Sequence, residues 1–357
     1  MATSAGPACL RSDSRAVTAL DEEISRLNAS LPNAAKSDPT EFEKLVRRLE
    51  TLQTDKRRLV SGEEQAPRLP TRVSSTANLG TQRTARPARR VEPARDGFIP
   101  ATWGENFRGF PNDLIRTGLF NVRRSEPRAQ LSNELIATYS NTMMLYSGEE
   151  LRIKDEDVLM QIFHFQQRFM LGIAWEANGR DFLKSMHWTD GQRGYNELYD
   201  SLLRLSKGHL TLMRRNEKGE AESFVLEAGA LLSELKVEHG GRAGPSRITI
   251  SVNPKTEMLW KSMGYTLVNW EQRLTLNGSL SRYLHRYYSS HQEPYPLKVA
   301  TLRTLTGSTA STKGKFVQLL KDALQSLVDI DFLAAYWIDK ADLVHVNRVR
   351  VVIGAAD

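Results

Sequence analysis

One stretch near the C-terminus, residues 297–346, constrains the fold more than any other part of the chain. Its apolar residues recur at steps of three and four, first in a short segment and then in a longer one, which predicts two helices with one buried face each. A Gly/Ser/Thr turn at residues 307–312 separates the two helices. Two β-rich runs, 332–338 and 343–349, follow and are joined by a polar turn, which predicts a hairpin. The longer helix is expected to bury Phe316, Leu319, Leu320, Ala323, Leu324 and Leu327.

Helix, turn, helix and hairpin in this order is the winged-helix arrangement, in which the second helix enters the DNA major groove. The charge of the stretch agrees with that reading, because five basic residues and no acidic one lie between Lys298 and Lys321. The whole chain carries a formal charge of +7, with a pI near 9.4. A basic chain favours a polyanionic partner. The sequence therefore predicts DNA binding.

A weaker copy of the same order lies upstream. Residues 180–188 predict a short helix, 192–207 a longer one, and 209–227 a hairpin around a polar turn. A further helix precedes each copy, at residues 155–168 and 270–291. Sliding one copy onto the other superposes three apolar pairs: Tyr195 on Phe316, Leu198 on Leu319 and Leu203 on Leu324. The repeated order predicts an internal duplication.

Other elements complete the first copy. Strands are expected at residues 169–175, within 139–146, and at 246–253. Pro254 is expected to open a helix, because proline is favoured in a first helical turn.

The fold class predicted is therefore α+β, with two tandem winged-helix domains at residues 98–264 and 265–357. Residues 1–61 predict a tail and a helical hairpin, from leucines at coiled-coil spacing. That hairpin either folds on itself or serves self-association or docking to a host protein. Residues 62–97 predict a disordered basic linker, with seven arginines against one acid between Gln65 and Arg95. The linker is either simply solvated or touches DNA phosphates.

Motifs for catalysis or metal binding are not found. The seven histidines are scattered, and Cys9 is the only cysteine. Gly307, Gly314 and Lys315 resemble a phosphate-binding loop, but six residues instead of four separate the two glycines, and Phe316 stands where a hydroxyl is required. The acidic run 155–157 begins a helix, where the helix dipole stabilises acidic side chains. We expect no enzyme activity, no metal and no cofactor.

The sequence also bears on localisation. No apolar run approaches the roughly 20 residues that a membrane-spanning helix needs. The first residues lack the basic segment and apolar core of a secretory signal. We expect a cytoplasmic protein without a membrane partner.

Candidate DNA contacts lie at the starts of the two long helices and around the hairpins. The N-terminal part of a recognition helix faces base edges, where Arg, Asn and Gln make bidentate contacts. We assign base contacts to Gln192, Arg193, Asn196, Thr312, Lys313, Lys315 and Gln318. Phosphate contacts are assigned to Arg214, Arg215, Lys218, Lys298, Arg303 and Lys340.

Several stretches resemble one known family. They are PNDLIRTGLFNV (111–122), YSGEEL (146–151), DEDVLMQIFHF (155–165), WEQRLTL (270–276), LHRYYSSHQEPYPLKVATLRTLTGS (284–308) and FVQLLKDALQSLVDIDFLAAYWIDKADLVHV (316–346). In these stretches the chain resembles the TrfA-type plasmid replication initiators, most strongly in its C-terminal half. The resemblance spans roughly residues 110–346 and leaves residues 1–97 outside it.

The resemblance implies an initiator that binds repeated sites, called iterons, in the double-stranded DNA of a plasmid origin. It implies melting of an adjacent AT-rich region, recruitment of the host initiator protein and the replicative helicase, a monomer–dimer equilibrium, and no ATPase. Some relatives bind the sliding clamp through a glutamine-led apolar peptide. Here Gln130, Leu131 and Ser132 begin such a peptide, but Asn133 and Glu134 break its apolar end.

Two other functions use the same modules. A winged-helix transcriptional repressor would bind an operator, and an interaction scaffold would dock proteins. A repressor suits a symmetric dimer on a palindrome, whereas two dissimilar modules in one chain suit a directional repeat. Two dissimilar modules in one chain therefore favour the initiator.

Overall fold

The structure is a computed structural model. It describes residues 97–99, 103–124, 127–138, 142–215, 221–238, 247–262, 264–291 and 293–349, together with some helical positions between 16 and 55. The chain forms two units, one of residues 92–213 and 226–357 and the other of residues 1–91 and 214–225.

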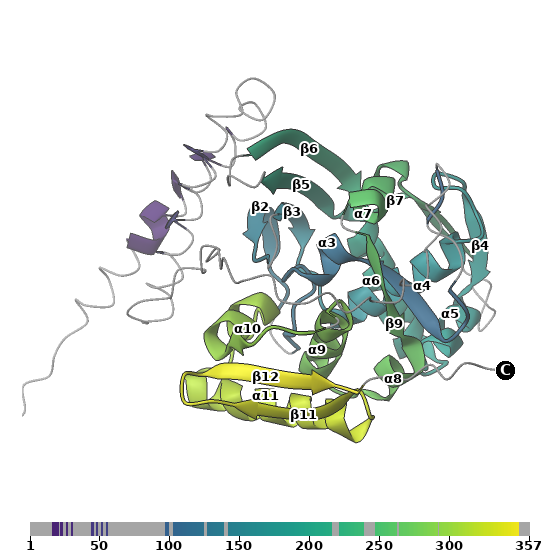
Figure 1. The fold of residues 1–357 in the computed structure, drawn as a ribbon. Helices are drawn as coiled ribbons and strands as arrows, with labels where there is room; N and C mark the ends of the chain where they lie inside the picture. Colours follow the sequence, from purple (N-terminus) through teal and green to yellow (C-terminus); the bar gives the residue numbers. More distant parts are fainter. Residues whose placement is uncertain are drawn as a thin grey trace, which may run out of the picture. The chain divides into compact units, whose positions relative to one another are not determined.

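From residue 107 onward the chain is mixed α+β (Figure 1). The strands are β1 (Phe107–Pro111), β2 (Gln130–Ile136), β3 (Thr142–Glu149), β4 (Trp175–Asn178), β5 (His209–Arg215), β6 (Ala221–Ala230), β7 (Leu232–Glu238), β8 (Arg247–Val252), β9 (Tyr265–Asn269), β10 (Leu297–Lys298), β11 (Leu333–Ile338) and β12 (Leu343–Arg348). The helices are α3 (Asn112–Ile115), α4 (Ile153–Gln166), α5 (Gly179–Ser185), α6 (Gln192–Lys207), the 3-10 turn η2 (Pro254–Thr256), α7 (Glu257–Ser262), α8 (Trp270–Thr275), α9 (Ser279–Ser289), α10 (Val299–Thr306) and α11 (Lys313–Asp329).

The strands form small sheets with the orders β2-β3-β5-β6, β4-β8-β7, β1-β9 and β10-β12-β11. The pairs β2–β3, β4–β8, β7–β8, β1–β9, β10–β12 and β11–β12 are antiparallel. The β1–β9 pair joins residues far apart in sequence, with Phe107 opposite Asn269 and Pro111 opposite Tyr265.

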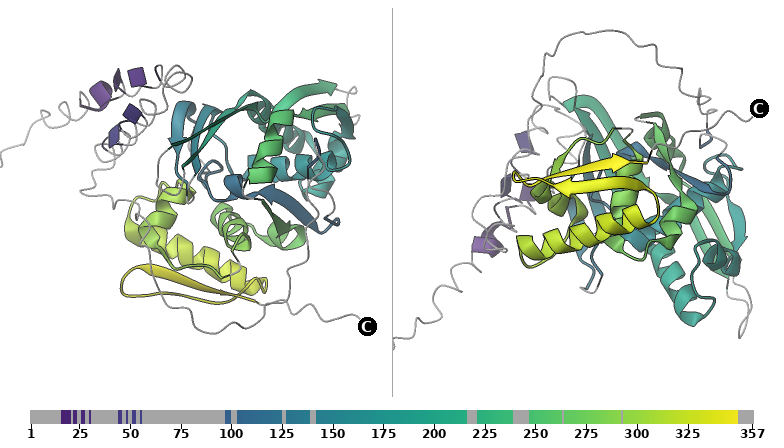
Figure 2. Two further views of the ribbon diagram at one scale, coloured as in Figure 1. Left: turned by 45° about the horizontal axis from the view of Figure 1, so that its top comes forward. Right: turned by 60° about the horizontal axis from the view of Figure 1, so that its bottom comes forward.

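The C-terminal module, residues 297–348, has the expected order of helix, turn, helix and hairpin. Helix α10 ends at Gly307, whose left-handed φ of 63° suits a residue without a side chain. Helix α11 begins after Thr312, whose side chain accepts a hydrogen bond from the Lys315 amide at 3.1 Å. The β11–β12 hairpin lies alongside α11 in both views of Figure 2.

The upstream module, residues 179–230, repeats this order with α5, α6, β5 and β6. Its long helix begins at Gln192 and ends at Lys207, as expected. The burial of the two long helices, however, shows that the expected superposition was wrong by one residue. Each buried residue of α6 matches a buried residue of α11 that lies 122 positions further on: Gly194 with Phe316, Leu198 with Leu320, Ser201 with Ala323, Leu202 with Leu324 and Leu205 with Leu327.

The error comes from two exposed leucines, which the expected superposition matched with buried leucines of the other helix. Leu319 was expected in the core but is 41% exposed, and Leu203 is 45% exposed. Spacing alone could not separate these leucines from their buried neighbours, because adjacent leucines both fit a pattern of threes and fours.

Two further expectations need correction. Residues 169–173 form a turn, and the strand begins only at Trp175. The helix expected at 270–291 is broken into α8 and α9, with Leu276 in an extended conformation and Gly278 preceding the second helix. Glycine and asparagine are poor helix formers, which explains a break at Asn277 and Gly278.

The expected strands at 139–146 and 246–253 correspond to β3 and β8, and Pro254 opens η2 and then α7. The domain boundary between residues 264 and 265 stays a prediction. The β1–β9 pair nevertheless joins segments on its two sides.

In the smaller unit, the described residues between 16 and 30 and between 44 and 55 are helical. Arg48 of the second segment donates to Glu23 of the first at 2.8 Å. The expected linker, apart from Gly97, lies outside the described residues. Among the described residues, no helix has the length and hydropathy that spanning a lipid bilayer requires.

Candidate nucleic-acid interface

The start of α11 presents polar side chains to solvent. Thr312, Lys313, Lys315 and Gln318 are all exposed. Two of them contact acids of their own module: Lys313 Nζ lies 2.5 Å from Asp342 Oδ2, and Gln318 Nε2 lies 2.8 Å from Asp322 Oδ1. These acids hold the side chains at the helix surface and partly neutralise its positive charge.

The start of α6 is built in the same way. Gln192 Nε2 donates to Asn196 Oδ1 at 2.8 Å. The Arg193 side chain is 91% exposed and reaches Glu197 Oε1 at 3.4 Å. Burial raises the pKa of Glu197, but Lys154 and Arg193 outweigh it and leave the pKa below its ordinary value. Glu197 is therefore charged at neutral pH.

The register shared by the two helices makes their exposed residues comparable. With the offset of 122 positions, Arg193 of α6 corresponds to Lys315 of α11, and Asn196 corresponds to Gln318. A cation and an amide thus occupy equivalent exposed positions, three residues apart, at the start of each long helix. Residues three apart lie on one face of a helix.

The predicted phosphate contacts fall into three groups. Lys298 is exposed directly before α10, and Lys340 is exposed in the β11–β12 turn. Arg303 is half-buried and donates to the Ala310 carbonyl at 2.7 Å, so it supports the turn between α10 and α11. The side chains of Arg214 and Arg215, and all of Lys218, lie outside the described residues.

A groove of about 540 Å³ lies beside the exposed face of α11, and no sequence signal predicted it. It is lined by Val317, Lys321, Gln325, Tyr336, Trp337, Ile338 and Asp342. Trp337 is 47% exposed and stacks on His345 with ring centroids 4.7 Å apart. The sequence could have singled out Lys321 as a candidate contact, because it is the last of the five basic residues from Lys298 that no acidic residue interrupts. The aromatic pair depends on cross-strand register, which places Trp337 opposite His345.

The segment 118–123 supports the C-terminal end of α10. The Val122 amide donates to the Thr306 carbonyl at 3.0 Å, and Arg123 Nε donates to the Gly307 carbonyl at 3.1 Å. A cation at a helix C-terminus is favoured by the helix dipole. Residues 118–123 therefore fix the turn between α10 and α11.

The acidic run 155–157 was expected to serve the helix start, and Asp155 does so. Its Oδ2 accepts the Arg152 amide at 2.8 Å in a capping box. All three carboxylates are also fully buried and paired with arginines, which the sequence did not indicate.

The described residues offer no cluster of His, Cys, Asp and Glu that could hold a metal ion. Gly314 and Lys315 lie in the first turn of α11 and Phe316 is buried beneath them, so this pair begins a helix.

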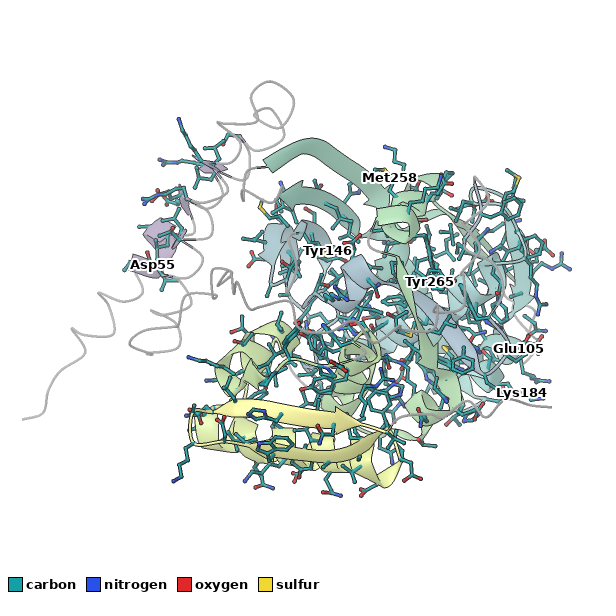
Figure 3. The ribbon with its side chains drawn as sticks, in the orientation of Figure 1. Asp55, Glu105, Tyr146, Lys184, Met258 and Tyr265 are labelled. Carbon is teal, nitrogen blue, oxygen red and sulfur yellow. The ribbon has the colours of Figure 1, made fainter. Side chains whose placement is uncertain are left out.

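His164 is buried. Its Nδ1 lies 3.1 Å from Trp103 Nε1, and its Nε2 lies 3.1 Å from Glu105 Oε2. Glu105 lies at the edge of the folded body in Figure 3. Burial and nearby Arg108 lower the pKa of His164 to about 4. The ring is therefore neutral at pH 7, and its Nδ1 accepts the Trp103 hydrogen bond.

Comparison with known proteins places these features in a family. The sequence model described as TrfA protein matches residues 92–348. The chain belongs to the TrfA family. The matched region contains both modules and the acidic run of α4, and it leaves out the N-terminal segment.

A curated member of the family, the plasmid replication initiator protein TrfA of Escherichia coli, is 28% identical over 256 residues. That match covers 70% of this chain and 64% of the relative's length. Among solved structures, one of domains 2 and 3 of RctB gives a TM-score of 0.44 at 12% identity. It covers 64% of this chain and 95% of the RctB chain. A second RctB structure of the same domains gives 0.42.

Proposed function

We propose that this chain is a plasmid replication initiator that binds direct repeats in a plasmid origin. In this proposal α5–α6 with β5–β6, and α10–α11 with β10–β12, are two winged-helix modules. The starts of α6 and α11 read bases in successive major-groove segments of one repeat. The phosphate contacts come from Lys298, Lys340 and Lys321.

One observation carries the proposal. The two long helices share one burial register, and that register places a cation and an amide at equivalent exposed positions of both. A cation and an amide are the side chains suited to guanine and adenine edges in the major groove. A protein-docking scaffold gives no reason for this match.

Family membership favours initiation over repression. The curated relative is named as a replication initiator. The two modules also differ in sequence and follow each other in one chain, so they suit a directional site. A symmetric repressor dimer would suit a palindrome.

The remaining parts of the proposal follow from the family. The chain would help to melt adjacent AT-rich DNA, recruit the host initiator and the replicative helicase in the cytoplasm, and exchange between monomer and dimer. It would do so without catalytic activity of its own. We leave the sliding clamp out, because Gln130–Ile136 forms strand β2, paired with β3, and is not a free peptide.

Protection footprinting tests the proposal. The purified full chain would be bound to DNA flanking its own gene, at two salt concentrations because affinity for DNA depends strongly on salt. Protected direct repeats beside an AT-rich tract are expected. One protected palindrome over a promoter would instead identify a repressor, and no protection at any site would favour a scaffold.

A further inference from the structure

The N-terminal part of α4 carries three consecutive carboxylates, Asp155, Glu156 and Asp157, that are fully buried. Burying a charge is costly unless partners compensate it. Here each carboxylate has arginine partners, and these arginines come from two different parts of the molecule. The side chains that they connect form the acidic-turn network.

One side of the network holds α6. Asp155 Oδ1 accepts from Ser201 Oγ at 2.7 Å and from Arg204 Nη2 at 2.8 Å. Both residues lie on the buried face of α6. Arg128 also pairs with Asp155, through Oδ2 at 2.8 Å. Helix α6 is therefore fixed to α4 by charged hydrogen bonds in addition to apolar packing.

The other side of the network holds α8 and α9. Arg273 of α8 bridges two carboxylates, with Nε 2.6 Å from Asp157 and Nη2 2.9 Å from Glu156. Two α9 residues complete it: Arg282 Nη1 lies 2.5 Å from Asp157, and Arg286 Nη1 lies 2.5 Å from Glu156. Burial works against the charge of Arg273, but Asp157 and Glu156 outweigh it, and the pKa of Arg273 lies above its ordinary value.

Helix α9 connects this network to the C-terminal module. It is buried on nearly all sides, from Ser281 through Tyr288. On one side Tyr283 donates to the Thr117 carbonyl, and on another His285 packs on Phe332 with centroids 4.5 Å apart. Two further hydrogen bonds join the helices to the module: Gln272 to the Ile330 carbonyl, and Arg348 to the His291 carbonyl.

We propose that the acidic-turn network sets the relative position of α6 and α11, and so makes the chain selective for the spacing between the two halves of one repeat. Asp155 fixes one long helix, while Glu156 and Asp157 fix the other through α8 and α9. The three carboxylates are consecutive in one helical turn, so little freedom remains between the two attachments. The network residues are positioning residues and touch no DNA. This inference rests on the proposed function.

The geometry of DNA gives the consequence. One helical turn of about 10 base pairs spans about 34 Å, so each inserted base pair moves the far half by about 3.4 Å and rotates it by about 34–36°. If α6 and α11 are held rigidly, they cannot both keep their base contacts after this displacement. Two loosely joined modules could keep both sets of contacts.

Arg282→Met is the first test variant, because it removes one arginine from Asp157 and leaves Arg273 in place. The carboxylate stays compensated, so the fold is expected to survive. Arg204→Met is the second variant and leaves Arg128 on Asp155. Arg282→Lys keeps the charge, and Arg247→Met removes an exposed arginine that pairs with Glu176 outside the network. Thermal unfolding confirms that each variant is folded.

The probes are duplexes carrying one footprinted repeat, each half of it alone, and the repeat with one or two base pairs inserted at its centre. The wild-type chain is expected to lose tenfold or more in affinity on insertion, about the cost of one mismatched base pair. In Arg282→Met and Arg204→Met, the affinity for each half should be unchanged, while the penalty for insertion falls to about threefold or less. Arg282→Lys and Arg247→Met should behave like the wild type.

Three outcomes would overturn the inference. One is a wild-type chain that tolerates insertion. Another is an unchanged insertion penalty in both network variants. The third is a loss of affinity for one isolated half, because the arginine would then act within a single module.

A measurement without DNA separates this inference from the proposed function. Spin labels at Asp200→Cys on α6 and Gln325→Cys on α11, in a Cys9→Ser background, report the distance between the two long helices. A narrow distribution is expected in the wild type and a broader one in Arg282→Met. Equal widths would overturn the positioning role even if the chain bound no repeat, which by itself would contradict only the proposed function.

Discussion

His285 is the most unusual single residue of the described chain. It is fully buried in α9, and neither ring nitrogen has a hydrogen-bond partner among the described residues. Burial, with Arg273 and Arg348 nearby, lowers the pKa of His285 to about 3. The ring is therefore neutral in the folded chain at pH 7.

Acid should therefore destabilise the fold through His285. Its folded pKa lies below the unfolded value of about 6.5, so the unfolded chain gains a proton that the folded chain does not. The stabilisation is fully present above pH 6.5 and is lost as pH falls toward the folded pKa. Replacing His285 by Phe should reduce the loss of unfolding free energy between pH 7 and pH 5 by ~2 kcal/mol.

Urea unfolding at the two pH values measures this difference. His164 and His291, whose pKa values are also lowered, stay in both proteins and contribute to the remaining acid sensitivity. An unchanged pH dependence in His285→Phe would mean that the ring binds a proton in the folded chain.

At the scale of elements, the two long helices are the informative pair. Their buried residues coincide at one offset, and their exposed starts carry the same kinds of side chain. The acids beside these starts hold the long side chains in place, which would lower the entropy lost in the proposed base contacts.

Arg193→Ala and Lys315→Ala should each weaken binding to the footprinted repeat by ~1–3 kcal/mol and relax the preference at one base position. Binding isotherms on the repeat and on single-base variants measure both effects. Lys236→Ala, an exposed lysine of β7 that pairs with Glu238, is the matched control. If neither variant changes affinity, α6 and α11 are not the reading helices.

The end of α10 offers a stability test. A side chain at Gly307 would adopt a left-handed φ of 63° and place Cβ 2.9 Å from Asn121 Cβ. Gly307→Ala should therefore lower the unfolding free energy by ~2 kcal/mol or more. Gly314→Ala is the contrast, because nothing lies within 4 Å of the new Cβ and alanine favours a helix by ~1 kcal/mol. Equal effects of the two changes would contradict this account of the α10 end.

At the scale of the whole molecule, the C-terminal half is joined to the rest through buried charge. Arg273 and Arg286 are fully buried, and their carboxylates lie more than a hundred positions upstream. Strand β9 also pairs with an upstream segment, the strand β1. The C-terminal half, residues 265–357, therefore depends on residues outside it.

A fragment of residues 265–357 should accordingly fail to fold. Without α4, Arg273 and Arg286 would lose their carboxylates, and removing one partner of a buried ion pair costs ~3–5 kcal/mol. Amide NMR spectra of this fragment should show narrow dispersion, whereas residues 92–357 should show a folded spectrum. A well-dispersed spectrum of the short fragment would support an autonomous domain that begins at residue 265.

Local sequence signals were enough to predict most helices and strands of the two modules. The long helices and hairpins follow from spacing and turn chemistry within a few residues, and α6 was predicted to the residue. The candidate DNA contacts at the helix starts depend on the same local signals, and they stay predictions.

Long-range packing selects which of two adjacent leucines is buried, and it gives the acids of α4 their arginine partners. Leu319 and Leu320 both fit the helical pattern, and only the packed neighbours select Leu320. Asp157 meets Arg273 across 116 positions, and no local signal links the two. Burial and charge pairing are properties of the assembled chain, because the surroundings of a side chain are set by segments far away in sequence.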